Sequence, residues 1–273
     1  MVMAADNRPM LQSVHQAGAV LLNALPDFFV DECKYDSARI VIPEAHVQVA
    51  VRFGSHLPGG FDVHAMGPRH KVHRKSIRGG QRTVCVRLPL GTCHAVLGKP
   101  ASEFAGRIVA LGELWNTAAT QRLEEQLAAA RDADAAVVSL KASIAERLEP
   151  RACSNTSARL VQSAARRLQS HNVASVAKDL GVSERHLRRV FHEMVGLSPK
   201  AFFKLMRFQR ALRAAQGGRN RAWSDIAVGA GYYDQAHLIA DFRSIAGATP
   251  REFLAESVCR DSIPSKTMIA SVL

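Results

Sequence analysis

The sequence of 273 residues lacks the long apolar run that a membrane-spanning helix requires. No stretch approaches about 18–20 consecutive apolar residues, so we expect no segment to span a bilayer. The apolar run at residues 17–25 is short, is interrupted by Asn23 and has no positively charged flank, which argues against a secretory signal. These absences predict a cytoplasmic protein that makes no membrane contact.

Cysteine is scarce and follows no framework pattern. The five cysteines are an odd number at unrelated spacings, without a C-x-x-C motif, which indicates free thiols in a reducing compartment. A nucleophilic pair of Cys85 or Cys93 with His94 has no acid partner and no oxyanion motif in view. We therefore expect no catalytic residues. The five positions are Cys33, Cys85, Cys93, Cys153 and Cys259.

An H-x-H motif is also absent, although histidines crowd the first hundred residues. A metal site on adjacent strands of a barrel needs two such histidines together with a Glu and a later His, so we expect no metal and no cofactor. Three of the histidines flank Gly67-Pro68, which predicts a loop around them. The six histidines within the predicted barrel region are His46, His56, His64, His70, His73 and His94.

Positive charge is what the chain has in excess. It carries 36 Lys and Arg against 24 Asp and Glu, a net charge of +12. Residues 160–255 hold 15 of the basic residues and only 7 of the acidic ones. Such a basic module suits the phosphate backbone of a nucleic acid, whereas the alternative is a solvated basic surface.

Short alternating segments from residue 39 to residue 90 predict β-strands. The period of two appears at residues 39–42, 46–53, 61–66 and 83–90, with Gly- and Pro-containing turns between them. This pattern predicts a small sandwich or barrel. We expect its interior to be apolar and to suit an apolar or aromatic effector. The inward residues would be Val47, Val49, Val51, Val84, Val86 and Leu88.

The period changes to 3.6 between residues 111 and 148, which predicts two amphipathic helices divided near Arg131-Asp132. Their apolar stripes are expected either to pack within the domain or to form a dimer contact. In an isolated barrel the second stripe would be exposed, which favours a homodimer. The stripes are Leu114, Ala118, Leu123 and Leu127, then Val137, Leu140, Ile144 and Leu148.

The stretch from Ala222 to Leu254 predicts a helix, a tight turn and a second helix. Gly231 supplies the positive φ of the turn, and Asp234 can cap the second helix. Leu238, Asp241, Phe242 and Ile245 of the second helix recur at a spacing of three to four, so we expect this face to pack inward. The opposite face carries amide and imidazole groups, a layout typical of a DNA-reading helix-turn-helix.

This pattern occurs twice. Residues 175–203 align with 225–254, with a second turn that is one residue longer. The matched pairs are Ala177 with Ala227, Gly181 with Gly231, Leu187 with Leu238, Phe191 with Phe242, Gly196 with Gly247, Pro199 with Pro250 and Phe202 with Phe253. Over roughly residues 160–255 the double unit closely resembles the DNA-binding domain of AraC/XylS-type transcription regulators, whose specific signature is the ending with Phe242, Gly247, Pro250 and Phe253.

The resemblance implies double-stranded DNA as the partner and assigns base-reading positions on both helices. Arginine suits guanine because its planar fork matches O6 and N7, and glutamine suits adenine. Many family members carry Arg where Ala240 stands, so the second unit is expected to read fewer bases. The alternative for Arg188 and Arg189 is a solvated or phosphate-only role. The assigned positions are Arg185, Arg188, Arg189, Gln235, Ala236, His237 and Ala240.

A long helix is predicted over Pro199–Gln216, stopped by Gly217-Gly218. As a rigid spacer it would hold the two recognition helices about one DNA turn apart, roughly 34 Å, on one face of the duplex. Candidate phosphate contacts on this helix are Lys204, Arg207 and Arg210, although all three could simply face solvent.

A weaker resemblance concerns the first half of the chain. The segments 86–91 and 95–104 are similar to the sensor half of one AraC subgroup, but Leu88 and Leu90 depart from its pattern. This resemblance implies a cupin-like fold.

The predicted fold class is α+β, with a small N-terminal β-barrel or sandwich and a C-terminal all-α domain of two helix-turn-helix units. The expected divisions are a sensor domain at 1–150, a linker at 151–157, the DNA-binding domain at 158–256 and a loose tail at 257–273. We expect a transcription regulator, with activation as the favoured mode and RNA polymerase and a small effector as further partners. The alternatives are a metal-binding or catalytic cupin-like domain fused to a DNA-binding domain, and a non-specific structural DNA binder.

Overall fold

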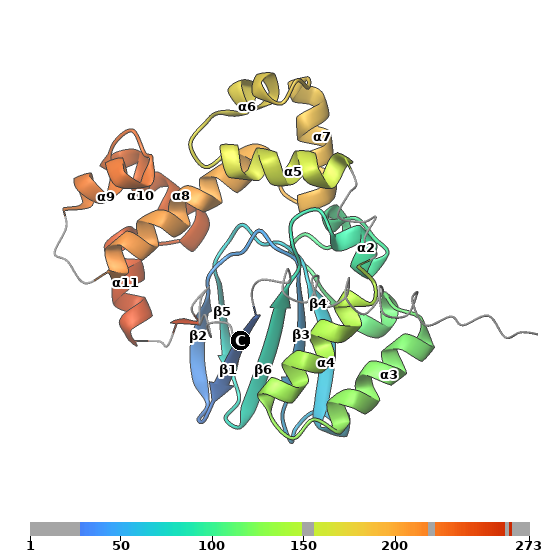
Figure 1. Cartoon of the computed structure of the whole chain (residues 1–273). Coiled ribbons are helices and arrows are strands. Elements are labelled where there is room, and N and C mark those ends of the chain that lie inside the picture. Colours follow the sequence, from blue (N-terminus) through green and yellow to red (C-terminus); the bar gives the residue numbers. More distant parts are fainter. Residues whose placement is uncertain (1–27, 149–155, 218–221, 260–261, 264–273) are drawn as a thin grey trace, which may run out of the picture.

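The computed structural model describes residues 28–148, 156–217, 222–259 and 262–263. Within these ranges, strands and three helices form the N-terminal part, and seven further helices form a second domain that lies across one end of the strands (Figure 1). The predicted α+β class and its division into a β-rich first half and a helical second half are therefore confirmed.

Two sheets form the N-terminal domain. The larger sheet has five antiparallel strands in the order β1-β6-β3-β4-β7, and the smaller has the order β5-β2-β8, with β8 parallel to β2. Predicted strands correspond to β2, β3, β4 and β6, whereas β1, β5 and β7 had no clear alternating pattern. In chain order the strands are β1 Phe28–Cys33, β2 Ser37–Val41, β3 Gln48–Phe53, β4 Phe61–Met66, β5 His73–Ile77, β6 Gln81–Arg87, β7 Ile108–Ala110 and β8 Ser262–Ile263.

The two faces of the larger sheet are chemically different. Val49 and Val51 of β3 are fully buried in a core that also contains the helices of the domain. Their neighbours Gln48 and Arg52 point to the opposite face and line a space between the two sheets. The predicted inward valines are buried, but they pack against helices instead of around an effector, so that part of the prediction is wrong. The space between the sheets is lined by both apolar and charged side chains.

The N-terminal helices cover the valine face. They are α2 Cys93–Leu97, α3 Thr117–Ala128 and α4 Ala133–Ala145, with 3-10 turns at Pro58–Gly60, Ala101–Glu103 and Leu111–Glu113. Asn116 and Asp132 cap α3 and α4 by accepting hydrogen bonds from the backbone N–H groups of Ala119 and Ala135. The predicted stripe at Val137, Leu140, Ile144 and Leu148 is buried in the domain's own core, so it does not offer the exposed dimer surface that we expected.

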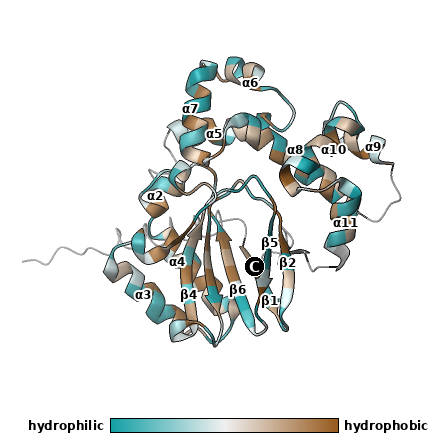
Figure 2. Ribbon diagram, turned by 180° about the vertical axis from the view of Figure 1, so that it is seen from behind, coloured by the Kyte–Doolittle hydropathy of each residue, from teal (hydrophilic) through white to brown (hydrophobic). Residues whose placement is uncertain are grey.

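Seven helices of the described ranges build the C-terminal domain, and several of them carry both hydrophilic and hydrophobic residues (Figure 2). The rings of Phe208, Phe242 and Phe253 meet in its core, with centroids 4.6–6.2 Å apart. The helices are α5 Thr156–Arg167, α6 Val173–Asp179, α7 Glu184–Val195, α8 Pro199–Gln216, α9 Trp223–Ala230, α10 Gln235–Ala246 and α11 Pro250–Cys259. Thus α5 includes the last two residues of the expected linker, and the expected tail begins inside α11. Residues 1–27, 151–155 and 264–273 lie outside the described residues.

The two domains share part of one core. Ile40, Ile42 and Ala45, from β2 and the loop after it, are buried together with the apolar residues of the C-terminal helices. At the end of α7, a Cβ atom on Gly196 would lie 2.6 Å from Pro68 and 2.7 Å from the carbonyl oxygen of Ala101. The C-terminal domain is therefore seated on the sheets rather than connected to them by a chain segment alone.

Candidate nucleic-acid interface

The first recognition helix, α7, begins where Ser183 accepts a hydrogen bond from the backbone N–H of His186 at 3.2 Å. It ends at Gly196, whose φ of 77° is readily adopted only by glycine. Leu187, Val190 and Phe191 are buried, so one face of the helix is fixed in the core. The capped N-terminal turn and the other face are left to solvent, as a DNA-reading helix requires.

All three arginines predicted to read bases lie on the exposed face of α7. Arg188 pairs with Glu184, and Arg189 lies 3.5 Å from Glu193, each one helical turn away. Such exposed pairs contribute little stability, so both guanidinium groups are available to a competing partner such as a guanine edge or a phosphate. Arg185 is exposed on the same first turns.

The second recognition helix, α10, repeats this construction. Asp234 accepts a hydrogen bond from the backbone N–H of His237 at 2.7 Å, and the helix ends at Gly247 with a φ of 72°. The predicted base-reading residues on α10 are all exposed. They are Gln235, Ala236, His237 and Ala240. Figure 1 shows the two units at opposite ends of α8, which connects them as the predicted spacer helix.

Arg207 of α8 faces the second unit rather than solvent. Its side chain is 11% exposed and donates to Asp241 Oδ2 at 2.9 Å. It also lies 3.2 Å from His237 Nε2, and its guanidinium stacks over the ring of Tyr232 at 4.5 Å. The expectation of a phosphate contact at Arg207 does not fit this geometry, because the side chain is nearly buried and its Nη2 already contacts Asp241 and His237 of α10.

The other two candidate phosphate contacts also have partners within the domain. Lys204 Nζ lies 3.1 Å from Asp241 Oδ1, with a third of its side chain exposed. Arg210 donates to the carbonyl oxygen of Gln169 at 2.9 Å. Sequence reasoning placed Asp241 on the inner face of its helix, but it gave no cationic partner for this buried carboxylate. An acidic residue at an inward-facing position of a basic domain could have predicted that Asp241 pairs with a lysine or an arginine.

One exposed aromatic residue beside α10 was also missed. Tyr233, in the turn before the helix, is 91% exposed, whereas its neighbour Tyr232 is buried. A large aromatic ring is thus held in solvent beside the residue that caps α10. Nothing in the sequence distinguished the two adjacent tyrosines, because the turn residues follow no period.

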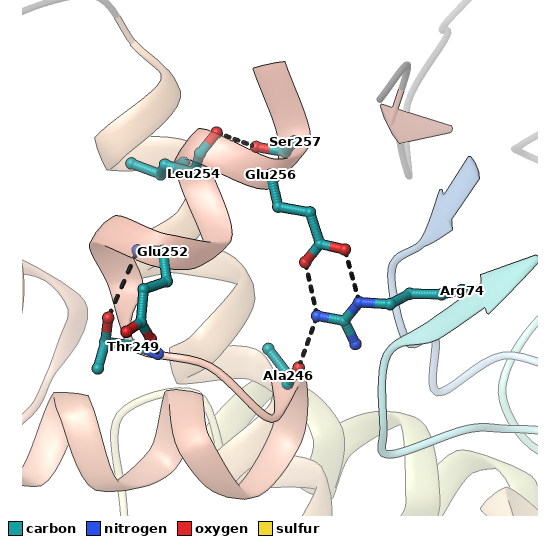
Figure 3. Close-up of polar contacts among 7 residues, drawn as sticks. All are labelled: Arg74, Ala246, Thr249, Glu252, Leu254, Glu256 and Ser257. Atoms are coloured by element: carbon teal, nitrogen blue, oxygen red, sulfur yellow. Dashed lines mark hydrogen bonds and ion pairs between the residues drawn. The ribbon is translucent and has the colours of Figure 1, made fainter. Parts of the chain in front are cut away.

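The second unit is tied directly to the smaller sheet, as Figure 3 shows. Arg74 of β5 donates to both carboxylate oxygens of Glu256 at 2.7 Å and to the carbonyl oxygen of Ala246 at 3.0 Å. In the same view, Thr249 and Glu252 form a reciprocal capping box at the start of α11. The ends of α10 and α11 are thereby fixed against the N-terminal domain.

Within the described ranges, Cys33, Cys85 and Cys93 are buried free thiols. Burial raises the pKa of Cys85 and of Cys93 to about 12, so both are protonated thiols at neutral pH. His64 is buried in β4 and His73 begins β5, which corrects the loop predicted around them. In the ranges that the structure covers, no three His, Cys, Asp or Glu side chains are grouped for a metal ion. None of the helices within those ranges has the length and apolarity needed to cross a bilayer.

Two capped helices with exposed polar faces, joined by a spacer helix in a basic domain, define a DNA-binding transcription regulator. Residues 158–256 match a family model described as a helix-turn-helix domain. The helix-turn-helix domain over these residues is of the AraC type, as the resemblance in the sequence predicted.

Comparison with solved structures gives distant similarities. The chain is similar to ToxT from Vibrio cholerae, with 11% identity, 84% of this chain and 96% of that chain covered, and a TM-score of 0.42. An unsaturated fatty acid-bound ToxT from the same organism gives 12% identity, coverage of 84% and 95%, and a TM-score of 0.42. A DNA-binding transcriptional dual regulator from Escherichia coli K-12 gives 25% identity over 41% of this chain and 97% of that chain, with a TM-score of 0.33. No curated protein matches the chain.

Proposed function

We propose that this regulator recognises a discrete operator with both units, placing α7 and α10 in successive major grooves on one face of the duplex. The observation that supports this most is the duplication: each helix has a side-chain cap, a buried apolar face, an exposed polar face and a left-handed glycine at its end. The three arginines of α7 make the first unit the stronger reader. The polar groups of α10 are smaller and fewer, so the second unit contacts fewer bases.

The N-terminal domain serves as the sensor in this proposal. It contributes residues to the core of the DNA-binding domain and holds the ends of α10 and α11 through Arg74. An effector that changes these contacts would change the relative placement of the two readers. We propose activation as the mode of regulation, with RNA polymerase as the partner at the promoter, and a homodimer as the form that occupies paired sites.

Genome-wide binding of the tagged protein, followed by footprinting on the recovered fragments, tests this function. We expect discrete sites in which two stretches, centred about 10 base pairs apart, are protected on one face. The double variant Gln235→Ala/His237→Ala should lose protection of one stretch only. Continuous, salt-sensitive coverage without discrete sites would instead indicate a non-specific structural DNA binder.

A further inference from the structure

A cavity lies between the two sheets of the N-terminal domain, on the face opposite to the helices. Its volume is about 160 Å³, and its apolar wall includes Phe29, Val41 and Met66. An apolar protein cavity of about 150 Å³ holds a molecule the size of benzene. The space therefore suits a small organic ligand rather than a sugar or a long lipid chain.

Positive charge is in excess around this cavity. The other charged groups near it are already engaged in pairs: Asp31 with Arg39 at 3.9 Å, Glu44 with Arg87 at 3.2 Å, and Arg52 with Asp62. Arg69 and Lys75 line the same space, and neither forms an ion pair with any residue that the structure describes. An anionic ligand would balance the partly buried Arg69, and the more exposed Lys75 would add to the attraction.

Two buried nitrogen atoms in the wall lack hydrogen-bond partners in the described part of the chain. His64 is only 6% exposed, and its Nδ1 makes no hydrogen bond, although Asp62 Oδ1 lies 3.4 Å away. Arg69 Nε is buried without a partner as well. Leaving such groups unsatisfied is unfavourable, and a ligand oxygen between the sheets would satisfy them.

Glu44 links this cavity to the DNA-binding domain. It lines the cavity, and its backbone oxygen accepts from the backbone N–H of Arg69 at 2.7 Å. Its side-chain Oε1 accepts from Gln209 Nε2 of α8 at 3.3 Å, and the same amide donates to the carbonyl oxygen of Pro43 at 2.8 Å. Gln209 is buried in the middle of the helix that joins the two readers. An anion beside Arg69 would repel the Glu44 carboxylate and disturb its contact with α8.

We propose that the cavity binds a small organic carboxylate of about benzene size, held by Arg69 and His64, and that Glu44 and Gln209 transmit its binding to α8. This inference rests on the proposed function, because it supplies the effector class and the route by which the sensor acts on the readers.

Calorimetric titration of the full-length protein tests the ligand class. The probes are benzoate, cyclopentanecarboxylate and 3-methylbutanoate, each paired with its neutral amide. At least one acid should bind about tenfold or more tightly than its amide, because charge-assisted hydrogen bonds are the stronger ones.

Arg69→Gln should remove this preference for the acid over its amide. Lys71 is a neighbouring exposed lysine outside the cavity, so Lys71→Gln should keep the preference. Lys75→Gln, on an exposed strand, provides a second test if Arg69→Gln does not fold. Equal binding of acids and amides, or a preference unchanged in both cavity variants, overturns the ligand class.

Operator affinity of the same proteins tests the route. The bound carboxylate should change operator affinity about fivefold or more. Gln209→Met retains the volume of the side chain but removes the amide, so it should still bind the carboxylate while its operator affinity no longer responds. An unchanged response of operator affinity to the carboxylate in Gln209→Met overturns the route.

The same two measurements distinguish this inference from the proposed function. Discrete operator binding without any carboxylate binding would refute this inference alone. The absence of discrete operator binding would refute the proposed function.

Discussion

At the scale of single residues, a substitution of Arg189 tests whether this side chain reads a base or contacts only the phosphate backbone. Its side chain is 64% exposed, and its contacts with Glu193 and with His186 are both long, at 3.5 Å. We expect Arg189→Ala to reduce specific affinity by about 1–3 kcal/mol and to relax the preference at one base pair. Selection from random DNA with the wild type and the variant measures this directly. An unaltered binding motif would assign Arg189 to phosphate or solvent.

Asp241 is expected to support the second unit through charge rather than volume. It is 5% exposed and pairs with Arg207 and Lys204, so Asp241→Asn leaves a buried guanidinium without its counter-charge. Removal of one partner of a buried pair should lower the free energy of unfolding by about 3 kcal/mol. Glu184→Gln, which removes an exposed pair with Arg188, should change it by less than about 1 kcal/mol. Urea unfolding followed by circular dichroism compares the two variants, and equal midpoints would contradict the ranking.

His64 should make the stability of the N-terminal domain sensitive to acid. Burial, and then the charge of Arg52, lower its pKa from 6.5 to about 4 in the folded state. The unfolded chain therefore takes up the proton first as the pH falls. The contribution of neutral His64 is complete above about pH 6.5 and is lost progressively toward pH 4, on the order of 3 kcal/mol in total. Melting temperatures between pH 7.5 and pH 5 should fall more steeply for the wild type than for His64→Gln, and parallel curves would contradict this assignment.

At the scale of elements, the glycines that end α7 and α10 form a matched pair. Gly196 and Gly247 both have φ near 75°, so alanine at either should cost about 1–2 kcal/mol of backbone strain. Only at Gly196 would the new Cβ also meet Pro68 and Ala101, whereas nothing lies within 4 Å of it at Gly247. In the full chain Gly196→Ala should be the more destabilising variant by thermal unfolding. In a fragment of residues 156–259 the two variants should be equally destabilising, because the N-terminal contacts are then absent.

The elements also show how far the sequence could predict the structure. Caps, glycine turns and apolar spacing are local signals, and they located both helix-turn-helix units and the pair of helices at residues 117–145. By contrast β5, with the sequence HRKSI, has four exposed residues and no alternation to reveal it. Alternation in β3 predicted a strand. It did not show which face of the sheet lines the cavity, because that depends on which face the helices α3 and α4 cover. That choice is made by tertiary packing, which no local period encodes.

At the scale of the whole molecule, the DNA-binding domain should fold without its sensor. Most of its core comes from its own helices, and the N-terminal half supplies the buried residues Ile40, Ile42 and Ala45, with Val72 and Leu90 packed against this core. We expect a fragment from Asn155 to Ser257 to be helical, less stable than in the full chain, and able to bind the same operator. Electrophoretic mobility shifts with operator and scrambled DNA measure this. Sequence-independent binding by a folded fragment would show that the sensor half contributes to recognition as well as to control.

The short strand β8 has a consequence for the order of synthesis. It follows the last helix of the reader, yet it pairs with β2, more than two hundred residues earlier in the chain. A ribosome delivers the first half of the protein well before these residues, so the smaller sheet consists at that stage of β2 and β5 alone. The open edge of β2 stays available until the reader has emerged and α11 has brought β8 into place. Synthesis of the N-terminal domain therefore starts before that of the DNA-binding domain, and its smaller sheet gains β8 only afterwards. In the sequence, the DNA-binding domain lies between two segments of the domain that controls it.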